Sequence, residues 1–298
     1  MSKVCIVTGA SQGLGRGIAH VLATEEGAKV YATARNLDLL EQLAEEAAKS
    51  KGEIIPYRLD QSDDKSSADF VNMVADKEAG IDLLVNSSYG GLTAMTPYFG
   101  KPFWERPISV FDASINIGLR SAYVMSSLVS PHMVNRGSGL LVQVSSLGGY
   151  HYLFDVGYGV GKAGLDRLTT DMAAELLPHG IRAITLYPGG AKTEIASFPD
   201  GETPTFSGRS VATLLNRVPS KELDKMNGKV IQTMELAIKY GFTDASGELP
   251  VGPFSSKESA ENSRKILSAT PIQYNLDAEL PNSSDTNNKE VAGFFPGA

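Results

Sequence analysis

The sequence is poor in the side chains that build disulfides and metal centres. Cys5 is the single cysteine among 298 residues, and the four histidines are scattered without the spacing of metal ligands. One thiol forms neither an intramolecular disulfide nor a thiolate metal cluster, so neither stabilises this fold. We therefore predict no metal site. A lone thiol also fits a reducing compartment, and we expect an intracellular, cytoplasmic protein.

Long apolar runs and an excess of basic residues are lacking too. No window approaches the roughly 18 apolar residues of a membrane-spanning helix, so we expect no transmembrane segment. No basic segment with a long apolar region precedes the strand-like residues 4–7, and we expect no secretory signal. The 34 acidic residues outnumber the 27 basic ones, for a net charge of -7. Binding to phosphate backbones needs a basic stripe, so we expect no nucleic acid partner.

What the chain does contain is an alternation of short apolar runs with segments of helical periodicity, which is typical of an α/β fold. With 42% hydrophobic residues, it can bury a substantial core. We predict a domain over residues 1–250 and a polar, partly disordered extension over residues 251–298. The expected strands are residues 4–7, 29–34, 54–59, 81–85, 140–144, 181–187 and 229–232. The expected helices include residues 37–50, 66–79, 109–135, 158–177 and 208–216.

The first apolar run leads into a glycine-rich turn and then a helix. Glycines at such a turn let a pyrophosphate approach the backbone, and the helix N-terminus offers unpaired N–H groups with a partial positive charge. A plain tight turn is the alternative, but the position directly after the first strand favours dinucleotide binding. The residues predicted to contact the cofactor here are Gly9, Ser11, Gln12, Gly13, Leu14 and Gly15.

The ends of the next strands predict which cofactor is used. The second strand ends at Arg35 with no acidic residue, and an arginine there suits the 2′-phosphate of NADP, whereas Asp or Glu would bind the ribose of NAD. We thus expect NADP(H) rather than NAD(H), with a plain surface arginine as the alternative. Asp60 ends the third strand near the expected adenine, although capping of the next turn explains it as well. Asn86 ends the fourth strand and is a further candidate for cofactor binding.

Tyr158 and Lys162 stand four residues apart on an expected helix, so their side chains lie on one face. Chance also produces this spacing, as a surface tyrosine beside a solvated lysine. Ser145 and Ser146 end the fifth strand, at the sheet edge where open α/β sheets bind ligands. Asn116 falls among apolar positions of the helix over residues 109–135, where a buried amide is either a structural strut or a proton relay.

The loop after the sixth strand is the candidate for the nicotinamide end of the cofactor. It can supply backbone and hydroxyl contacts, although a proline-terminated strand is the alternative. The irregular segments 89–108 and 196–207 differ from routine connections and are expected to face the substrate. The loop residues predicted to bind the cofactor are Pro188, Gly189, Ala191 and Thr193.

These motifs occur in one order along residues 3–250: Thr8-Gly9-x-x-x-Gly13-x-Gly15, Asp60, Asn86, Asn116, Ser145-Ser146, Tyr158-x-x-x-Lys162 and Pro188-Gly189 through Thr193. The order resembles the short-chain dehydrogenase/reductase family, and segments 102–105, 116–120, 158–162 and 240–241 are similar to its member 1 branch. The resemblance implies a single Rossmann-type doubly wound α/β domain with about seven parallel strands and helices on both faces. It also implies a homodimer or homotetramer that associates through the helices carrying Asn116 and Tyr158.

The family's catalytic tetrad falls by position on Asn116, Ser146, Tyr158 and Lys162. It implies an NADP(H)-dependent carbonyl reductase or alcohol dehydrogenase in which Tyr158 is the general acid or base and Ser146 holds the carbonyl oxygen. Lys162 and Tyr158 also contact the cofactor, and Asn116 positions a water. We expect Lys162 and the oxidised nicotinamide to lower the pKa of Tyr158. The aromatic and proline content of the variable segments predicts an apolar ketone, aldehyde, steroid or retinoid as the small-molecule substrate.

Two departures from the family pattern stand out. The usual Asn-Asn-Ala-Gly segment is Asn-Ser-Ser-Tyr at residues 86–89, so the family pattern does not predict the geometry of that loop. The interval from Ser146 to Tyr158 is one residue short, and Ser145 would restore it, but the Ser-Ser-x-x-Gly pattern favours Ser146. A non-catalytic dinucleotide-binding sensor or scaffold is the alternative function.

Overall fold

Seven parallel strands form one sheet, in the order β3-β2-β1-β4-β5-β6-β7, in the computed structural model, which describes residues 2–269. The chain runs outward from β1 to β3 and then returns to continue from β4 on the other side of β1, so the carboxyl ends of β1 and β4 flank the crevice where such sheets bind ligands. The predicted doubly wound sheet is confirmed. The strands are β1 Val4–Thr8, β2 Lys29–Ala34, β3 Glu53–Arg58, β4 Leu83–Asn86, β5 Gly139–Val144, β6 Ile181–Tyr187 and β7 Val230–Gln232.

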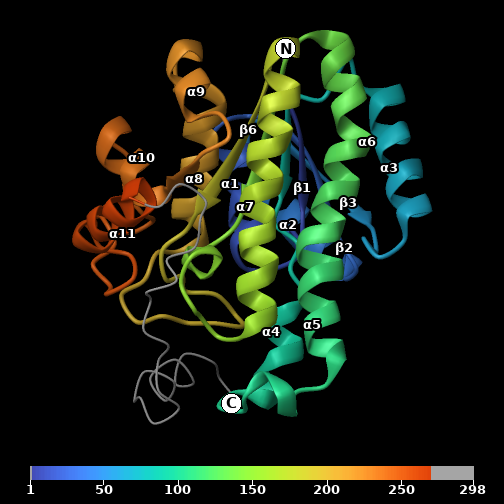
Figure 1. Ribbon diagram of the computed structural model, residues 1–298. Coiled ribbons are helices and arrows are strands. Elements are labelled where there is room, and N and C mark those ends of the chain that lie inside the picture. The colour runs from blue at the N-terminus through green and yellow to red at the C-terminus, as the bar shows by residue number, and fades with distance from the viewer. Residues whose placement is uncertain (1, 270–298) are drawn as a thin grey trace.

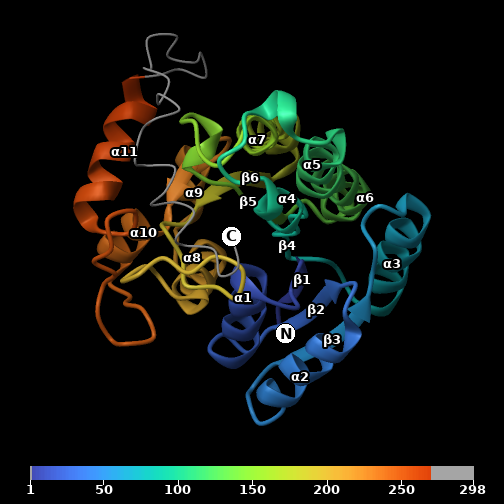
Figure 2. The ribbon, with the colours of Figure 1, turned by 90° about the horizontal axis from the view of Figure 1, so that it is seen from below.

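Helices cover both faces of the sheet, as Figures 1 and 2 show from two directions. Each long helix has an apolar stripe, and this stripe packs against one side of the buried strands. One layer contains α1 Gly13–Thr24, α2 Leu37–Ala47, α8 Pro204–Asn216 and α10 Thr233–Tyr240, and the other contains α3 Asp64–Lys77, α6 Ser121–Arg136 and α7 Val156–Leu176. Shorter or peripheral helices are α4 Gly91–Met95, α5 Ile108–Ser114, α9 Ser220–Met226 and α11 Lys257–Ala269.

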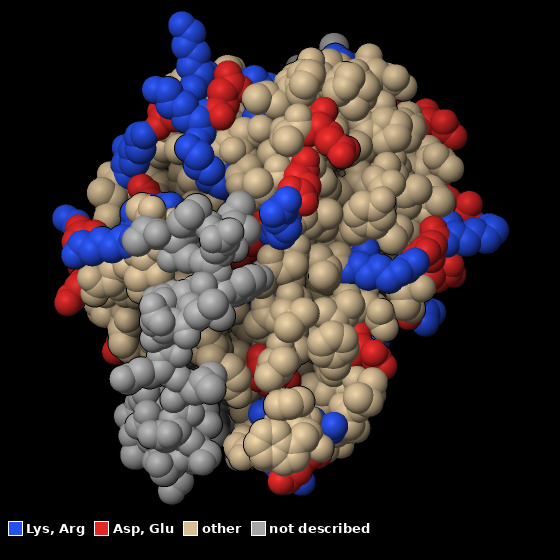
Figure 3. Space-filling model, viewed as in Figure 1, with Lys and Arg blue, Asp and Glu red and all other residues tan. Residues whose placement is uncertain are grey.

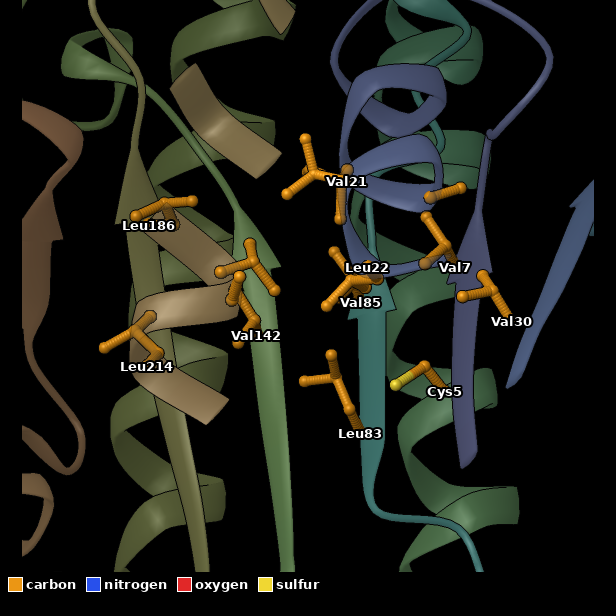
Figure 4. Packing of buried hydrophobic residues seen from close by; sticks show 14 of the residues in the cluster. Cys5, Val7, Val21, Leu22, Val30, Leu83, Val85, Val142, Leu186 and Leu214 are labelled. Atoms are coloured by element: carbon orange, nitrogen blue, oxygen red, sulfur yellow. The ribbon is translucent and has the colours of Figure 1, made fainter. Parts of the chain in front are cut away.

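The core between the sheet and the α1 layer consists mainly of branched aliphatic side chains. Figure 4 shows Val7, Val85, Val142 and Leu186 from neighbouring strands pointing to the same side of the sheet. Cys5 lies among them and is fully buried. Burial raises the pKa of its thiol, so the group stays protonated and acts as a small apolar side chain.

The helix expected over residues 109–135 is interrupted. Helix α5 is followed by a π-helical segment, Ile115–Arg120, and only then by α6. A π-helical turn holds more residues than an α-helical turn, so the side chains shift around the axis relative to a continuous α-helix. Asn116 lies in this segment and is exposed, so the expectation that it is buried is wrong.

The chain stays packed beyond residue 250. In α11, Ala260 is buried and its carbonyl accepts a hydrogen bond from Gln232 Nε2 at 3.0 Å. Arg264 forms an ion pair with Glu235 of α10 and donates to the Val230 carbonyl at 2.8 Å. The described structure therefore continues through the first part of the predicted extension, and residues 270–298 of that extension lie outside the described residues.

The surface carries both signs of charge. In Figure 3, lysine, arginine, aspartate and glutamate side chains are scattered over the visible face and form no continuous basic stripe among the residues that it describes. Over residues 2–269, no helix combines the length and the apolar character needed to cross a membrane.

Candidate active site

A cleft of about 550 Å³ opens at the carboxyl ends of the central strands. It brings together the glycine-rich turn, the end of β2, the serines after β5, the start of α7 and the loop after β6. Of the residues predicted for the site, those that line the cleft are Gly9, Ser11, Gln12, Gly13, Leu14, Gly15, Arg35, Asp60, Ser145, Ser146, Tyr158, Lys162, Pro188, Gly189, Ala191 and Thr193. Asn86 and Asn116 do not line it.

The glycine-rich turn has the geometry of an anion cradle. Gly9 has φ +65°, a conformation that favours glycine, and a Cβ atom on Gly15 would stand 2.3 Å from the Gly9 carbonyl oxygen. The first helical N–H, that of Gly13, donates to the carboxylate of Glu194 at 2.8 Å. An anionic oxygen thus already lies at the N-terminus of α1, where the helix dipole favours it.

Arg35 and Asp60 border the far end of the cleft. Arg35 is exposed and follows β2 directly. Asp60 accepts hydrogen bonds from the backbone N–H of Ser62 at 2.9 Å and from its hydroxyl at 2.8 Å, and these bonds, with a smaller contribution from Arg35, lower the Asp60 pKa. Asp60 therefore both orders the turn and lines the cleft, so the two interpretations of this residue are compatible.

Tyr158 and Ser146 meet in the cleft. The Tyr158 hydroxyl donates to Ser146 Oγ at 2.8 Å. Asp155 caps the start of α7 by accepting from the Tyr158 backbone N–H, and Arg106 pairs with Asp155 at 2.9 Å in a buried position. Ser145 also lines the cleft, but its hydroxyl donates to the Lys162 carbonyl at 3.3 Å. Of the two candidate serines, Ser146 is therefore the one in contact with the Tyr158 hydroxyl.

Lys162 is buried one helical turn after Tyr158. Its Nζ donates to the Val144 carbonyl at 3.0 Å and lies 4.8 Å from the centre of the Tyr89 ring. Loss of water contacts disfavours the ammonium ion, so burial lowers the Lys162 pKa to about 8, opposed by the nearby Asp166 carboxylate. The lysine charge is thus sensitive to pH in the neutral range.

The Tyr158 pKa moves opposite to the expected direction in the protein alone. Burial raises it to about 12, while the hydrogen bond with Ser146 acts in the lowering direction. Lys162 Nζ lies 5.8 Å from the centre of the Tyr158 ring and is bonded to the Val144 carbonyl. Desolvation therefore outweighs any help from the lysine, and the phenol is protonated at neutral pH.

Neither predicted asparagine points into the cleft. Asn86 is buried behind it, where its side-chain amide donates to Ser126 Oγ at 3.1 Å and to the Ala122 carbonyl at 3.3 Å, tying β4 to α6. Asn116 lies in a surface groove beside Asp64 and Arg120. From this part of the chain, Ile117 of the π-helical segment and Ala113 of α5 line the cleft instead of Asn116.

The loop after β6 is held by a buried carboxylate. Glu202 accepts from the Gly189 backbone N–H at 3.1 Å, from Ser207 Oγ at 2.8 Å and from Thr233 Oγ1 at 2.7 Å. Burial raises its pKa to about 7, although these three hydrogen bonds act in the lowering direction. Glu202 thus joins the cleft loop to α8 and α10.

Sequence reasoning missed three side chains around the cleft: Tyr89, Glu194 and Glu202. Tyr89 replaces the glycine of the family motif, which marks this position as unusual, but the sequence does not indicate where the ring lies. Glu194 follows Thr193, and Glu202 stands in a segment rich in proline, glycine, serine and threonine, where an acidic residue looks like an ordinary surface residue. For metals, no group of three or more potential ligands gathers anywhere in the described part of the chain.

The fold and the cleft define a dinucleotide-binding oxidoreductase of the short-chain dehydrogenase/reductase family, and the chain belongs to this family: its model, described as short chain dehydrogenase, matches residues 3–200. The member 1 proteins are similar over most of their length. Dehydrogenase/reductase SDR family member 1 of Mus musculus is 38% identical over 275 residues, 85% of this chain and 86% of the relative. The Homo sapiens protein of that name is 37% identical over 278 residues, 86% and 87% of the two chains.

Solved structures give the same result. A metagenomic short-chain oxidoreductase in complex with NADP superposes with a TM-score of 0.65 at 28% identity, covering 77% of this chain and 95% of that one. The family assignment therefore rests on fold as well as on sequence.

Proposed function

We propose that this oxidoreductase uses NADP(H) to interconvert a carbonyl and an alcohol by hydride transfer, with Tyr158 as the general acid or base. The observation that carries the proposal is the 2.8 Å hydrogen bond from the Tyr158 hydroxyl to Ser146 Oγ inside a cleft that also contains the anion cradle. A proton donor, a hydrogen-bonding serine and a dinucleotide-sized groove in one place are the components that carbonyl reduction requires.

The residues present fit a nicotinamide dinucleotide. The Gly13 N–H already binds a carboxylate oxygen, which supports a phosphate at the same amide, and Glu194 must leave that amide when a phosphate binds. Arg35 stands exposed at the other end of the cleft, in place for a 2′-phosphate. Bound there, the cofactor supplies or accepts the hydride. The name of the metagenomic neighbour adds support, since that protein was solved with NADP.

The side chains of the chain itself then handle the proton. Ser146 donates a hydrogen bond to the substrate oxygen, where negative charge develops, and holds it beside Tyr158. In the reductive direction Tyr158 gives up its proton, and its pKa of about 12 keeps that proton in place until the oxygen becomes basic. Below about pH 8 Lys162 is an ammonium ion, which stabilises the phenolate left behind.

Cofactor preference tests the role of Arg35. In Arg35→Asp, we expect the KM for NADPH to rise roughly 10- to 100-fold with little change for NADH, because a charged hydrogen bond to the 2′-phosphate is lost and a repulsive charge is added. Arg58→Asp is the matched control, since Arg58 is exposed and pairs with Ala34 in the sheet but does not line the cleft. The same ratio of the KM values for NADPH and NADH in wild type and Arg35→Asp would show that Arg35 does not bind the 2′-phosphate.

The substrate that we propose is an apolar ketone or aldehyde, with steroids and retinoids as candidates. Aromatic and aliphatic side chains form part of the cleft wall, namely Leu92, Phe154, Ile195 and Phe198. Apolar walls with few polar groups favour apolar ligands. The test is a panel of such carbonyl compounds assayed with NADPH and NADH, with cofactor oxidation as the signal. Cofactor binding without turnover of any compound would favour the sensor or scaffold function.

We also propose that the protein forms a homodimer or homotetramer through α7 and the helical segment that carries Asn116, which begins with α5. Large apolar side chains are exposed on α5 and α7: Ile108 is 75%, Phe111 42%, Val156 41% and Val160 46% exposed. Burial of such side chains against a second copy favours association. Light scattering on the full chain measures the number of subunits.

A further inference from the structure

Tyr89 fills the space beside the catalytic pair. Its ring meets the Tyr158 ring edge-on, with 5.5 Å between centres and 88° between planes. The same ring presents its face to Lys162, whose Nζ lies 4.8 Å from the ring centre. Tyr89 follows β4, whereas Tyr158 and Lys162 belong to α7, so the ring joins two elements that meet at the cleft.

The fold makes room for this ring. A Cβ atom on Gly91 would stand 2.3 Å from the Tyr89 hydroxyl oxygen, and one on Gly118 would stand 2.9 Å from Cδ2 of the ring. The Tyr89 hydroxyl lies 2.9 Å from Ser114 Oγ. Ser114 itself donates to the Val110 carbonyl at 3.3 Å, so the tyrosine is the donor in the bond between the two hydroxyls. One hydrogen bond and the space left by two glycines thus fix the ring in one orientation.

Lys162 depends on this ring because its other contacts are few. Among the described residues, the hydrogen bond of its Nζ goes to the Val144 carbonyl. The ionisable side chain that acts on its charge is Asp166, on the same helix, and the ring centres of Tyr89 and Tyr158 lie 4.8 Å and 5.8 Å from its Nζ. A desolvated ammonium ion is stabilised by an aromatic face, and most strongly where water is excluded. Asn116, which the family resemblance places at the site, is turned to the surface.

We propose that Tyr89 is a positioning residue, which holds the Lys162 ammonium ion with its ring face and orients the Tyr158 ring with its edge. The proposal rests on the proposed function for its effect on turnover, but not for its effect on the charge of Lys162. It explains why a bulky aromatic residue stands where the family motif has glycine: the ring provides a cation-stabilising surface that no backbone amide at that position would supply.

The test is a direct titration of Lys162 in the full chain. Protein labelled with ¹³C at the lysine Cε position is titrated by NMR, and the Lys162 signal is assigned by its loss in Lys162→Met. Wild type should titrate near pH 8. Tyr89→Phe keeps the ring, so Lys162 should titrate at nearly the same pH. Tyr89→Leu removes the ring, so Lys162 should titrate at about pH 7, because the neutral amine is then favoured.

A control variant and a kinetic measurement complete the test. Tyr123→Leu makes the same exchange at an exposed position of α6 and should leave the Lys162 titration unchanged. A midpoint shift from about pH 8 to about pH 7 lowers the charged fraction at pH 7.5 about threefold, so kcat of Tyr89→Leu should fall about threefold there and recover at pH 6. KM for NADPH should change less than kcat.

The outcomes separate the two proposals. Identical Lys162 titrations in wild type, Tyr89→Phe and Tyr89→Leu would overturn the role of Tyr89. A shift in Tyr89→Leu alone supports that role even if no carbonyl compound is turned over, in which case the proposed function fails while the positioning role stands. A shift of the same size in Tyr89→Phe would assign the effect to the Ser114 hydrogen bond and so contradict the ring as its source.

Discussion

Replacing Tyr158 by phenylalanine should lower kcat for carbonyl reduction by about 10³-fold and leave NADPH affinity nearly unchanged. The hydroxyl that bonds Ser146 is lost, and with it the proton that the substrate oxygen must receive. The ring remains, so its edge-on contacts with Tyr89 and Phe154 persist and the cleft keeps its shape. The measurements are kcat with the best compound of the panel and NADPH binding by calorimetry.

The control for this variant removes a tyrosine hydroxyl elsewhere. Tyr123 is 57% exposed on α6, and Tyr123→Phe should retain full activity. Full activity of Tyr158→Phe would show that another group supplies the proton. Loss of NADPH binding together with kcat would point to a damaged cleft, so the two measurements must be made on the same preparation.

Removing the Glu202 carboxylate should have the largest effect on stability. Glu202→Ala leaves three donors without their buried acceptor, those of Gly189, Ser207 and Thr233, and we expect the free energy of unfolding to fall by about 3 kcal/mol. The loop after β6 loses its tie to α8 and α10 at the same time. Urea unfolding of the two proteins at one pH measures the difference.

The same carboxyl predicts a dependence on pH. Its pKa is raised from 4.5 to about 7 in the folded protein, so folding favours the protonated acid. The stability that the folded protein gains from the raised pKa is fully present below about pH 4.5 and is lost as the pH rises through about 7. Glu202→Gln stays neutral, so its free energy of unfolding relative to wild type should rise between pH 5 and pH 8. The pKa of Asp166 is also raised to about 7, but that group is present in both proteins, and its contribution cancels.

A constant difference in the free energy of unfolding between Glu202→Gln and wild type from pH 5 to pH 8 would show that burial does not raise the Glu202 pKa. A difference that falls towards pH 8 would mean that the carboxylate, and not the acid, is the form that the folded loop prefers. Either result would contradict the prediction that burial outweighs the three hydrogen bonds in setting the Glu202 pKa.

The sheet was predictable because each strand is a short apolar run between helical segments. Strands β1, β2 and β6 lie within a residue of the expected ranges, and the glycine-rich turn follows β1 as expected. The sequence also indicates Ser146 over Ser145, and in the structure Ser146 bonds the Tyr158 hydroxyl whereas Ser145 bonds the Lys162 carbonyl. Local patterns thus predict positions along the chain well.

The remaining features of the site depend on contacts between distant segments. Apolar periodicity over residues 109–135 predicts one helix, and nothing in it marks the π-helical turn that carries Asn116 outward. The hydrogen-bond partners of Glu202 come from three segments, so its burial follows from the assembled fold. The Tyr158 pKa likewise depends on how much water the folded cleft excludes. Packing, and not residue type, decides all three.

Carbonyl reduction by this protein is tested most directly by following the hydride itself. NADPH carrying deuterium at C4, on one face or the other, is incubated with the protein and each compound of the carbonyl panel, and the products are analysed by mass spectrometry. One labelled form should give an alcohol with deuterium at its carbinol carbon in wild type, and Tyr158→Phe should give almost none in the same time. NADPH that binds in the cleft but transfers no deuterium to any compound would contradict the proposed hydride transfer to a carbonyl.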